Sequence, residues 1–384
     1  MFAAIPLAWL QLIRERMRLV VALAGISFAV ILMMIQLGFR DALFDASITM
    51  HINLKADIVL INPQSTSLIA MKQFSRRRLY QTLGVPGVES VTPMYLDFAI
   101  WRNPENRKTR QLMVIAYPPD ADVFNLPGVT ASQEEVKKSD VVLFDEAGRP
   151  EFGPISQWFK AGKTVTAEVS GRKVTVGGIF KMGASFGADG NLITSDLNLI
   201  RMDAQRSQGL IDVGLIKVEP GADVRAIFQR IRKELPDDVK VLTKKGFADF
   251  EQSYWQSSTA IGFIFTLGSA MGFIVGIVIV YQILYTDVSD HLAEYATLKA
   301  MGYRSYFLIS VVLQEALILS VLGFLPGFFL SIGLYSLTKN ATSLPIGMTV
   351  DRGITVFILT VVMCVVSGAI AMRKVQAADP ADIF

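Results

Sequence analysis

The chain has 384 residues, of which 52% are hydrophobic and 18% are charged, and its net charge is +3. This composition is more apolar than that of an ordinary soluble protein, and the small, dispersed charge argues against binding to nucleic acid. One cysteine, Cys364, and two histidines, His51 and His291, exclude an internal disulfide and a Cys-based metal cluster and argue against a His-rich metal site.

The first residues predict a helix that lies along a membrane surface. Leu7, Leu10, Ile13 and Met17 recur at helical spacing, and the charged residues near them fall on the other side. A helix of this kind places its apolar face in the interface of a bilayer. We therefore expect a cytoplasmic amphipathic helix over residues 1–18.

Four apolar runs are long enough to cross a bilayer, which takes about 20 residues. They occupy residues 19–39, 259–286, 305–337 and 353–372. The first run is too long for the apolar core of a cleaved signal peptide, and no small-residue cleavage site follows it. It is interpreted as an uncleaved anchor, so the sequence predicts four transmembrane helices.

Short basic flanks determine the expected orientation, because positive residues near the ends of spans stay in the cytoplasm. Such flanks precede the first span, follow the fourth, and lie between the second and third: Arg14, Arg16, Arg18, Arg373, Lys374, Lys299 and Arg304. We therefore place both termini, the tail 373–384 and the segment 287–304 in the cytoplasm of an inner-membrane protein. Residues 40–258 and the short loop 338–352 are then periplasmic.

The large segment between the first two spans, residues 40–258, carries the patterns of a mixed α and β domain. A hairpin is predicted at Ser170 and Gly171, where two alternating strands meet at a turn. Two β-α-β units flank it, one from residue 212 to residue 244 and a comparable one that begins at Ala56. The expected fold is therefore four transmembrane helices plus an α+β extracytoplasmic domain with two subdomains.

A search for catalytic patterns finds none. The phosphate-binding loop, the nucleophile elbow and the zinc-binding helix motif are all missing from the sequence. The glycine-rich stretch 181–191 is interpreted as a mobile surface loop, and the acid pairs Asp145-Glu146 and Asp237-Asp238 are assigned to turns. We predict no catalytic residue, no metal site and no cofactor bound by this chain.

The membrane segments carry signals of close helix packing. Gly268, Gly272 and Gly276 form a doubled G-x-x-x-G in the second span, which permits close approach of another helix; ordinary glycine enrichment in membrane helices is the alternative explanation. Pro326 in the third span removes a backbone donor and is expected to kink the helix. Together these residues indicate a mobile bundle rather than a simple anchor.

Two polar residues, Gln314 and Glu315, interrupt the third span. An acid at the centre of a bilayer costs about 2.5–3.5 kcal/mol, and less near the interface. Two explanations for Glu315 stay open. It takes part in coupling or in pairing between helices, or it is a neutral, hydrogen-bonded structural acid.

The polar segment 287–304 between the second and third spans has helical periodicity. Its apolar positions are spaced by four, three, three and three residues: Val288, Leu292, Tyr295, Leu298 and Met301. Gly302 fits the end of such a helix. The acidic residues Asp287, Asp290 and Glu294 would be repelled by an anionic membrane surface, so we expect this helix to bind a protein groove rather than lipid head groups.

This segment resembles the cytoplasmic coupling segment of FtsX-like, MacB-like ABC permeases. The pattern E-x-A-x-L-K-A-x-G of that family is matched by Glu294, Ala296, Leu298, Lys299, Ala300 and Gly302. The C-terminal sequence with Asp379, Pro380 and Ala381 resembles the ending of the family, and the order of spans and domain is also similar. Within the family, residues 7–39 and 110–120 are most similar to the DevC-type permeases of cyanobacterial exporters.

The resemblance implies a homodimer of non-catalytic permeases, each bound to a separate cytoplasmic ATPase that carries ATP and Mg²⁺. Tyr295, Leu298 and Met301 would pack in the groove of the ATPase, and Glu294 and Lys299 would contact its rim. A DevC-like member would work with a periplasmic membrane-fusion adaptor and a TolC-like outer-membrane channel, and glycolipid is the substrate class of that branch. The alternative is a transmitter that transports nothing and regulates a periplasmic partner enzyme.

Overall fold

The computed structural model describes residue 9 and residues 14–203, 206–207, 209–294, 297, 301–303, 305–342 and 344–377. The chain divides into two compact units. The first is formed by Met1–Ala42, Ile261–Ala341 and Ile346–Phe384, and the second by Leu43–Ala260 and Thr342–Pro345. We refer to them as the helix bundle and the extracytoplasmic domain.

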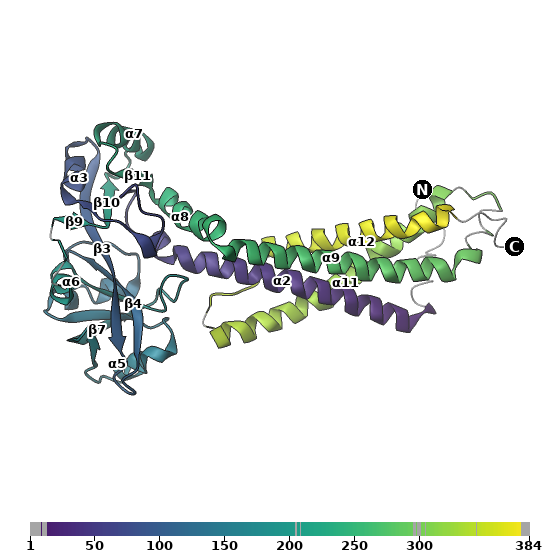
Figure 1. The fold of residues 1–384 in the computed structure, drawn as a ribbon, viewed down its shortest axis with the longest axis horizontal. Coiled ribbons are helices and arrows are strands. Elements are labelled where there is room, and N and C mark those ends of the chain that lie inside the picture. The colour runs from purple at the N-terminus through teal and green to yellow at the C-terminus, as the bar shows by residue number, and fades with distance from the viewer. Residues whose placement is uncertain are drawn as a thin grey trace. The chain divides into compact units, whose positions relative to one another are not determined.

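The helix bundle is built from four long helices, which are α2 (Arg16–Asn53), α9 (Ala260–Asp290), α11 (Ser305–Thr342) and α12 (Val350–Ala377) (Figure 1). Each contains a stretch long and apolar enough to cross a membrane, which confirms the expected four membrane helices. The helix α2 extends well beyond the predicted first span, because its apolar pattern continues through the buried residues Phe44, Ala46 and Met50.

The extracytoplasmic domain contains a nine-stranded sheet in the order β11-β1-β10-β3-β4-β8-β5-β7-β6. Its strands are β1 (Ile58–Ile61), β3 (Val88–Arg102), β4 (Thr109–Tyr117), β5 (Val141–Asp145), β6 (Thr166–Val169), β7 (Arg172–Phe180), β8 (Asn191–Ser195), β10 (Val213–Val218) and β11 (Lys240–Thr243). A separate two-stranded sheet pairs β2 (Phe74–Ser75) with β9 (Leu210–Ile211). The α-helices of the domain are α3 (Arg76–Gln81), α4 (Pro127–Ala131), α5 (Ile155–Lys160), α6 (Asp196–Met202), α7 (Val224–Glu234) and α8 (Lys244–Ser253).

Both predicted β-α-β units are present, and they interlock. The unit β1-α3-β3 and the unit β10-α7-β11 contribute alternate strands to one half of the sheet, in the order β11-β1-β10-β3 with antiparallel neighbours. This is a split β-α-β arrangement. The strands β4 to β9 are an insert between the two units, so the tertiary structure joins segments that the sequence separates widely.

The predicted hairpin is confirmed. Strands β6 and β7 pair up to Val169 and Arg172, and the two residues between them, Ser170 and Gly171, have φ angles of +48° and +82°. Positive φ at both central positions is the geometry of a type I′ turn, whose twist matches that of the flanking strands.

Strand β3 joins the two halves of the large sheet. Its first part pairs with β10, and its second part pairs with β4 and β6. The two expected subdomains are therefore halves of one continuous sheet. Alternate residues of a strand belong to different hydrophobic cores: in β4, Val114 contributes to one core and Ile115 to the other. Burial on both faces explains why this strand reads as a continuous apolar run.

Asp145, which the sequence assigned to a turn, lies in a strand instead. It is the last residue of β5 and is only 1% exposed. Its carboxylate accepts hydrogen bonds from the backbone N–H groups of Met182 and Gly183 and from the side-chain amide of Asn191. Burial raises the pKa of the Asp145 carboxyl. The glycine-rich stretch 181–191 is therefore held by a buried carboxyl at its two ends, which a sequence pattern does not reveal.

Glu251 of α8 is a second buried acid of the domain, with 2% exposure. One carboxylate oxygen accepts from the backbone N–H of Leu68 and the other from the indole Nε1–H of Trp255, each at 2.7 Å. Trp255 belongs to a single π-helical turn, Tyr254–Ser258, that follows α8. Burial raises the pKa of Glu251 to about 6.

The raised pKa of Glu251 predicts a pH-dependent contribution to stability. Because the folded state favours the protonated acid, this contribution is complete below the ordinary pKa of 4.5 and is lost as pH rises through about 6. A shift of this size corresponds to about 2 kcal/mol. Glu251→Gln is expected to remove this component from the difference in unfolding free energy between pH 4.5 and pH 7, measured on the full chain in detergent. Glu234→Gln, at an exposed position on α7, is the control; an unchanged pH profile for Glu251→Gln would contradict the prediction.

Candidate functional site

The predicted coupling segment lies partly outside the described residues. Tyr295, Ala296, Leu298, Lys299 and Ala300 are among those outside, as are most of residues 1–13 and all of residues 378–384. Within the described part, Glu294 is exposed and Met301 is 63% exposed. Gly302 has a φ of +93°, the left-handed conformation that a helix-ending glycine adopts.

The three glycines of α9 lie against other helices of the bundle. Gly272 faces Leu32 and Met33 of α2, and Gly268 faces the side chain of Gln36, also on α2. At the third position, Gly276, an added Cβ would lie 2.9 Å from the Cβ of Ala29 and would meet Met363 of α12. The absence of side chains at these positions therefore lets α9 approach α2 closely.

A second glycine pair, which the sequence analysis did not single out, lies on α11. An added Cβ would meet Ile26 at Gly323 and would lie 2.9 Å from Val30 at Gly327, so both glycines face α2. The spacing G-x-x-x-G was the available signal. The Ser27 hydroxyl donates to the Gly323 carbonyl at 2.9 Å, close to Pro326, where the helix lacks a backbone donor. The kink expected at Pro326 stays a prediction.

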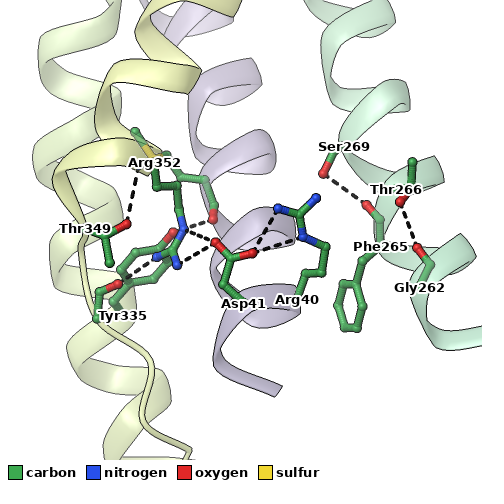
Figure 2. A network of polar contacts seen from close by, with 11 residues as sticks. Arg40, Asp41, Gly262, Phe265, Thr266, Ser269, Tyr335, Thr349 and Arg352 are labelled. Atoms are coloured by element: carbon green, nitrogen blue, oxygen red, sulfur yellow. Dashed lines mark hydrogen bonds and ion pairs between the residues drawn. The ribbon is translucent and has the colours of Figure 1, made fainter. Parts of the chain in front are cut away.

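One polar cluster joins α2, α11 and α12 (Figure 2). Arg352 of α12, with a side chain only 5% exposed, donates through Nε and Nη2 to one carboxylate oxygen of Asp41 on α2, at 3.1 and 2.9 Å. Its Nη1 donates to the Gly347 carbonyl at 2.7 Å, and its guanidinium lies over the ring of Tyr335. The Tyr335 hydroxyl in turn donates to the carbonyl of Met34 on α2.

Figure 2 also shows Arg40 on the other side of Asp41, donating to the second carboxylate oxygen at 2.9 and 3.0 Å. The Arg40 side chain is 35% exposed, so water screens this pair more than the buried pair with Arg352. Asp41 therefore forms ion pairs with two arginines. The charge of the buried one, Arg352, is less screened by water and relies more on Asp41 as its counterion. We call Asp41, Tyr335 and Arg352 the Asp41 cluster.

A second polar cluster joins α2 to α9 near the coupling segment. Arg18 of α2 donates to Asp287 of α9 at 3.3 Å and pairs with Asp290 one turn further on. It also pairs with Glu15 at 2.6 Å. Glu315 of α11, with 1% exposure, lines the same small cavity as Arg18 and Asp287. We call these five residues the Arg18 cluster.

The two clusters hold α2 at positions 23 residues apart, from Arg18 to Asp41. That separation corresponds to about 35 Å of helix, close to the thickness of the hydrocarbon core of a bilayer, about 30 Å. Between the clusters, the buried face of α2 includes Ile26, Val30 and Met33. The helix α2 is thus tied by ion pairs near both membrane boundaries and by glycine contacts in between.

No His, Cys, Asp or Glu group in the described part of the chain has three or more members placed to hold a metal ion. The intramembrane residue Glu315 is brought to Asp287 and Arg18 by the packing of three helices, which its sequence position does not indicate. Chemically, this arrangement provides ion pairing between the Arg18 guanidinium and the carboxylates of Asp287 and Asp290.

Known proteins place the chain in a family. The model for the FtsX-like permease C-terminal region matches residues 258–380, and the model for the MacB-like periplasmic core domain matches residues 19–234. Curated proteins give no match.

Three solved structures match about half of the chain. The extracellular domain of the noncanonic ABC-type transporter YknZ from Gram-positive bacteria is 13% identical, covers 49% of this chain and 99% of its own, and has a TM-score of 0.34. The periplasmic region of MacB from Actinobacillus actinomycetemcomitans is 14% identical. It covers 53% of this chain and 94% of its own, with a TM-score of 0.36. A domain of a putative permease protein from Porphyromonas gingivalis is 14% identical. It covers 50% of this chain and 90% of its own, with a TM-score of 0.30.

The two family models together account for the helix bundle and the extracytoplasmic domain, and the MacB-like model alone spans more than half of the chain. The match to the FtsX-like model includes the segment 287–304, which carries the E-x-A-x-L-K-A-x-G pattern. The chain therefore belongs to the family of FtsX-like ABC permeases with a MacB-like periplasmic core domain.

Proposed function

We propose that this chain is the permease subunit of an ABC export complex and acts as a mechanical transmitter. In this proposal, a separate ATPase binds the segment 287–304, and the helix bundle passes its movement to the extracytoplasmic domain. The observation that carries the proposal is the placement of α2. It is one helix from Arg16 to Asn53 that contributes residues to both units, and ion pairs hold it to α9 and α12.

In this proposal, movement of the ATPase first reaches the bundle at the C-terminal end of α9. The last residue of this helix, Asp290, pairs with Arg18 of α2, and the coupling segment follows directly. A displacement of that segment would therefore act on α2 through an ion pair and through the glycine contacts at Gly272 and Gly276. Packed helices pass small displacements on because their interfaces switch between discrete arrangements instead of deforming continuously.

Two described residues of the coupling segment support a protein contact there. Met301 is 63% exposed, although a methionine gains from burial, and Glu294, seven residues earlier, is also exposed. Tyr295 and Leu298 complete the apolar stripe in the sequence. ATP and Mg²⁺ would be bound by the ATPase chain, and the permease would contribute no catalytic residue.

The proposal predicts that Leu298→Asp abolishes binding of the ATPase without changing membrane insertion. A charge at the centre of a groove contact removes a buried anchor, and such anchors typically contribute more than about 1 kcal/mol each. The measurement is the ATP hydrolysis activity that co-purifies with the chain from its native membranes. Ala293→Asp places the same charge about 140° away from Leu298 around the predicted helix, at an exposed position, and is the matched control. Wild-type ATPase recovery with Leu298→Asp would refute the coupling assignment.

The proposal extends to the assembly and the cargo. The permease would form a homodimer in the inner membrane with both termini in the cytoplasm, and would work with a periplasmic membrane-fusion adaptor and a TolC-like outer-membrane channel. The cargo would be a lipid, glycolipid or other envelope component. The support for these finer points is the DevC-type resemblance of residues 7–39 and 110–120 and the absence of any recognised catalytic motif.

ATP-dependent release of a labelled lipid to a periplasmic acceptor, measured with the purified complex in vesicles, tests the export step. Movement of lipid that requires ATP and is lost in Leu298→Asp supports export. Activation of a periplasmic wall hydrolase without movement of lipid would instead favour the alternative, in which the chain regulates a partner enzyme.

A further inference from the structure

The small cavity of the Arg18 cluster has an unusual lining for the interior of a helix bundle. Four charged residues line it: Glu15, which directly precedes α2, Arg18 of α2, Asp287 of α9 and Glu315 of α11. Apolar side chains of the same three helices form the rest of the wall. Charged groups inside a membrane protein are rare, pair with one another, and often mark proton pathways.

Glu315 is buried, with a side chain that is 1% exposed, and no donor among the described residues reaches either of its carboxyl oxygens. Within the same described part of the chain, Oδ2 of Asp287 also has no donor, while its Oδ1 accepts from Arg18. Burial of an ionised carboxylate without a compensating donor is strongly unfavourable, and such a group binds a proton instead.

The charges around the cavity do not balance. Among the described residues, the Arg18 guanidinium lies among four carboxyl groups, those of Glu15, Asp287, Asp290 and Glu315. Its ion pairs are with Glu15, Asp287 and Asp290, and not with Glu315. His291, which follows α9, has its Nδ1 at 3.0 Å from the backbone oxygen of Asp287 and 3.7 Å from the carboxylate. The described residues that α12 contributes nearby include the apolar Met372.

We infer that this cavity is a proton-binding site, in which Glu315 carries an exchangeable proton and shares it with Asp287. The acid form of Glu315 supplies the donor that the unpartnered oxygens lack, and Arg18 stabilises the negative charge on Asp287. No group of three or more metal-ligating side chains is found among the described residues. The Arg18 guanidinium already supplies the positive charge next to Asp287. The ligand is therefore a proton rather than a metal ion.

The site is placed to link proton binding to movement of the coupling segment, a step that rests on the proposed function. Arg18 contacts Asp287 and Asp290 at the end of α9. When α9 moves away from Arg18, Asp287 loses its cation and takes up a proton from water. When Arg18 returns, that proton is released, and the carboxylate–guanidinium pair forms again.

Infrared spectroscopy of the purified full chain tests the site, in a detergent that has no ester carbonyls. At neutral pH we expect a band of a protonated carboxyl that shifts on exchange into heavy water and is lost in Glu315→Gln. Asp290→Asn, at a side chain that is 51% exposed, is the control and is expected to keep the band. Arg18→Gln is expected to add a second protonated carboxyl, which the double variant Arg18→Gln/Asp287→Asn loses.

Persistence of the band in a folded Glu315→Gln variant, or the lack of any such band in the wild type, would overturn the proton-binding site. A band that changes on exchange between sodium and potassium would assign the cavity to an alkali cation and would overturn it too. Circular dichroism establishes that each variant is folded. Because the ATPase takes no part in these measurements, their outcome is independent of the Leu298→Asp experiment, and the two proposals fail separately.

Discussion

Replacement of Asp41 by alanine is expected to destabilise the helix bundle by about 3 kcal/mol, because it leaves a buried guanidinium without its counterion. Arg352 is 5% exposed and Asp41 is 31% exposed, so the loss falls at the lower end of the range for buried ion pairs. Within the part of the chain that the structure describes, the Arg352 guanidinium then keeps the Gly347 carbonyl and the ring of Tyr335. The measurement is the unfolding free energy of the full chain in detergent, from denaturant titration followed by circular dichroism.

Two controls separate the buried charge from other effects of the substitution. Arg40→Ala removes the more exposed arginine that pairs with Asp41 and is expected to change the unfolding free energy by less than about 1 kcal/mol. The double variant Asp41→Ala/Arg352→Met removes both charges of the pair and is expected to be more stable than Asp41→Ala alone. A double variant that is less stable than Asp41→Ala would show that the pair does not act in this way.

Replacement of Gly327 by valine is expected to destabilise the bundle by about 1–3 kcal/mol through overpacking. An added Cβ at Gly327 would lie 2.9 Å from the Cβ of Val30 and 3.0 Å from the backbone carbonyl oxygen of Ser27. A branched side chain and a backbone cannot both move aside, so α11 would have to separate from α2. The same unfolding measurement reports the loss.

The chain offers a matched control in the same helix. Gly333 of α11 has no atom within 4 Å of an added Cβ, so Gly333→Val introduces the same side chain without a clash. Because glycine is the poorer helix former, Gly333→Val is expected to be neutral or slightly stabilising. Equal losses at Gly327 and Gly333 would attribute the effect to helix propensity or to the detergent rather than to contact with α2.

Both predictions concern α2, which makes the first helix more than an anchor for the domain that follows it. Ion pairs join it to α9 and α12, and glycines bring α9 and α11 close to its buried face. The proposed function predicts that variants which loosen these contacts uncouple ATP hydrolysis from the extracytoplasmic domain before they unfold the bundle. ATPase activity that no longer responds to cargo would be the sign of such uncoupling.

Several features were predictable from the sequence because they are local and periodic. A span is a run of apolar residues, the hairpin at Ser170 and Gly171 is set by two adjacent residues, and the helix α7 shows its apolar face at a spacing of three and four. The motif around Glu294 identified the family by the same kind of short-range pattern. Each of these depends on residues that are neighbours along the chain, where backbone geometry fixes what they can form.

The sequence alone therefore determined the four membrane helices, the mixed α and β domain with its two β-α-β units, and the family. Only the tertiary structure decided that Asp41 pairs with Arg352, 311 residues away, and Arg18 with Asp287, 269 residues away. In the sequence these charges look like ordinary flanks of spans. Asp145 and Glu315 could not be placed either, because burial and partners depend on which elements pack together, and packing between distant segments leaves no local pattern in a single chain.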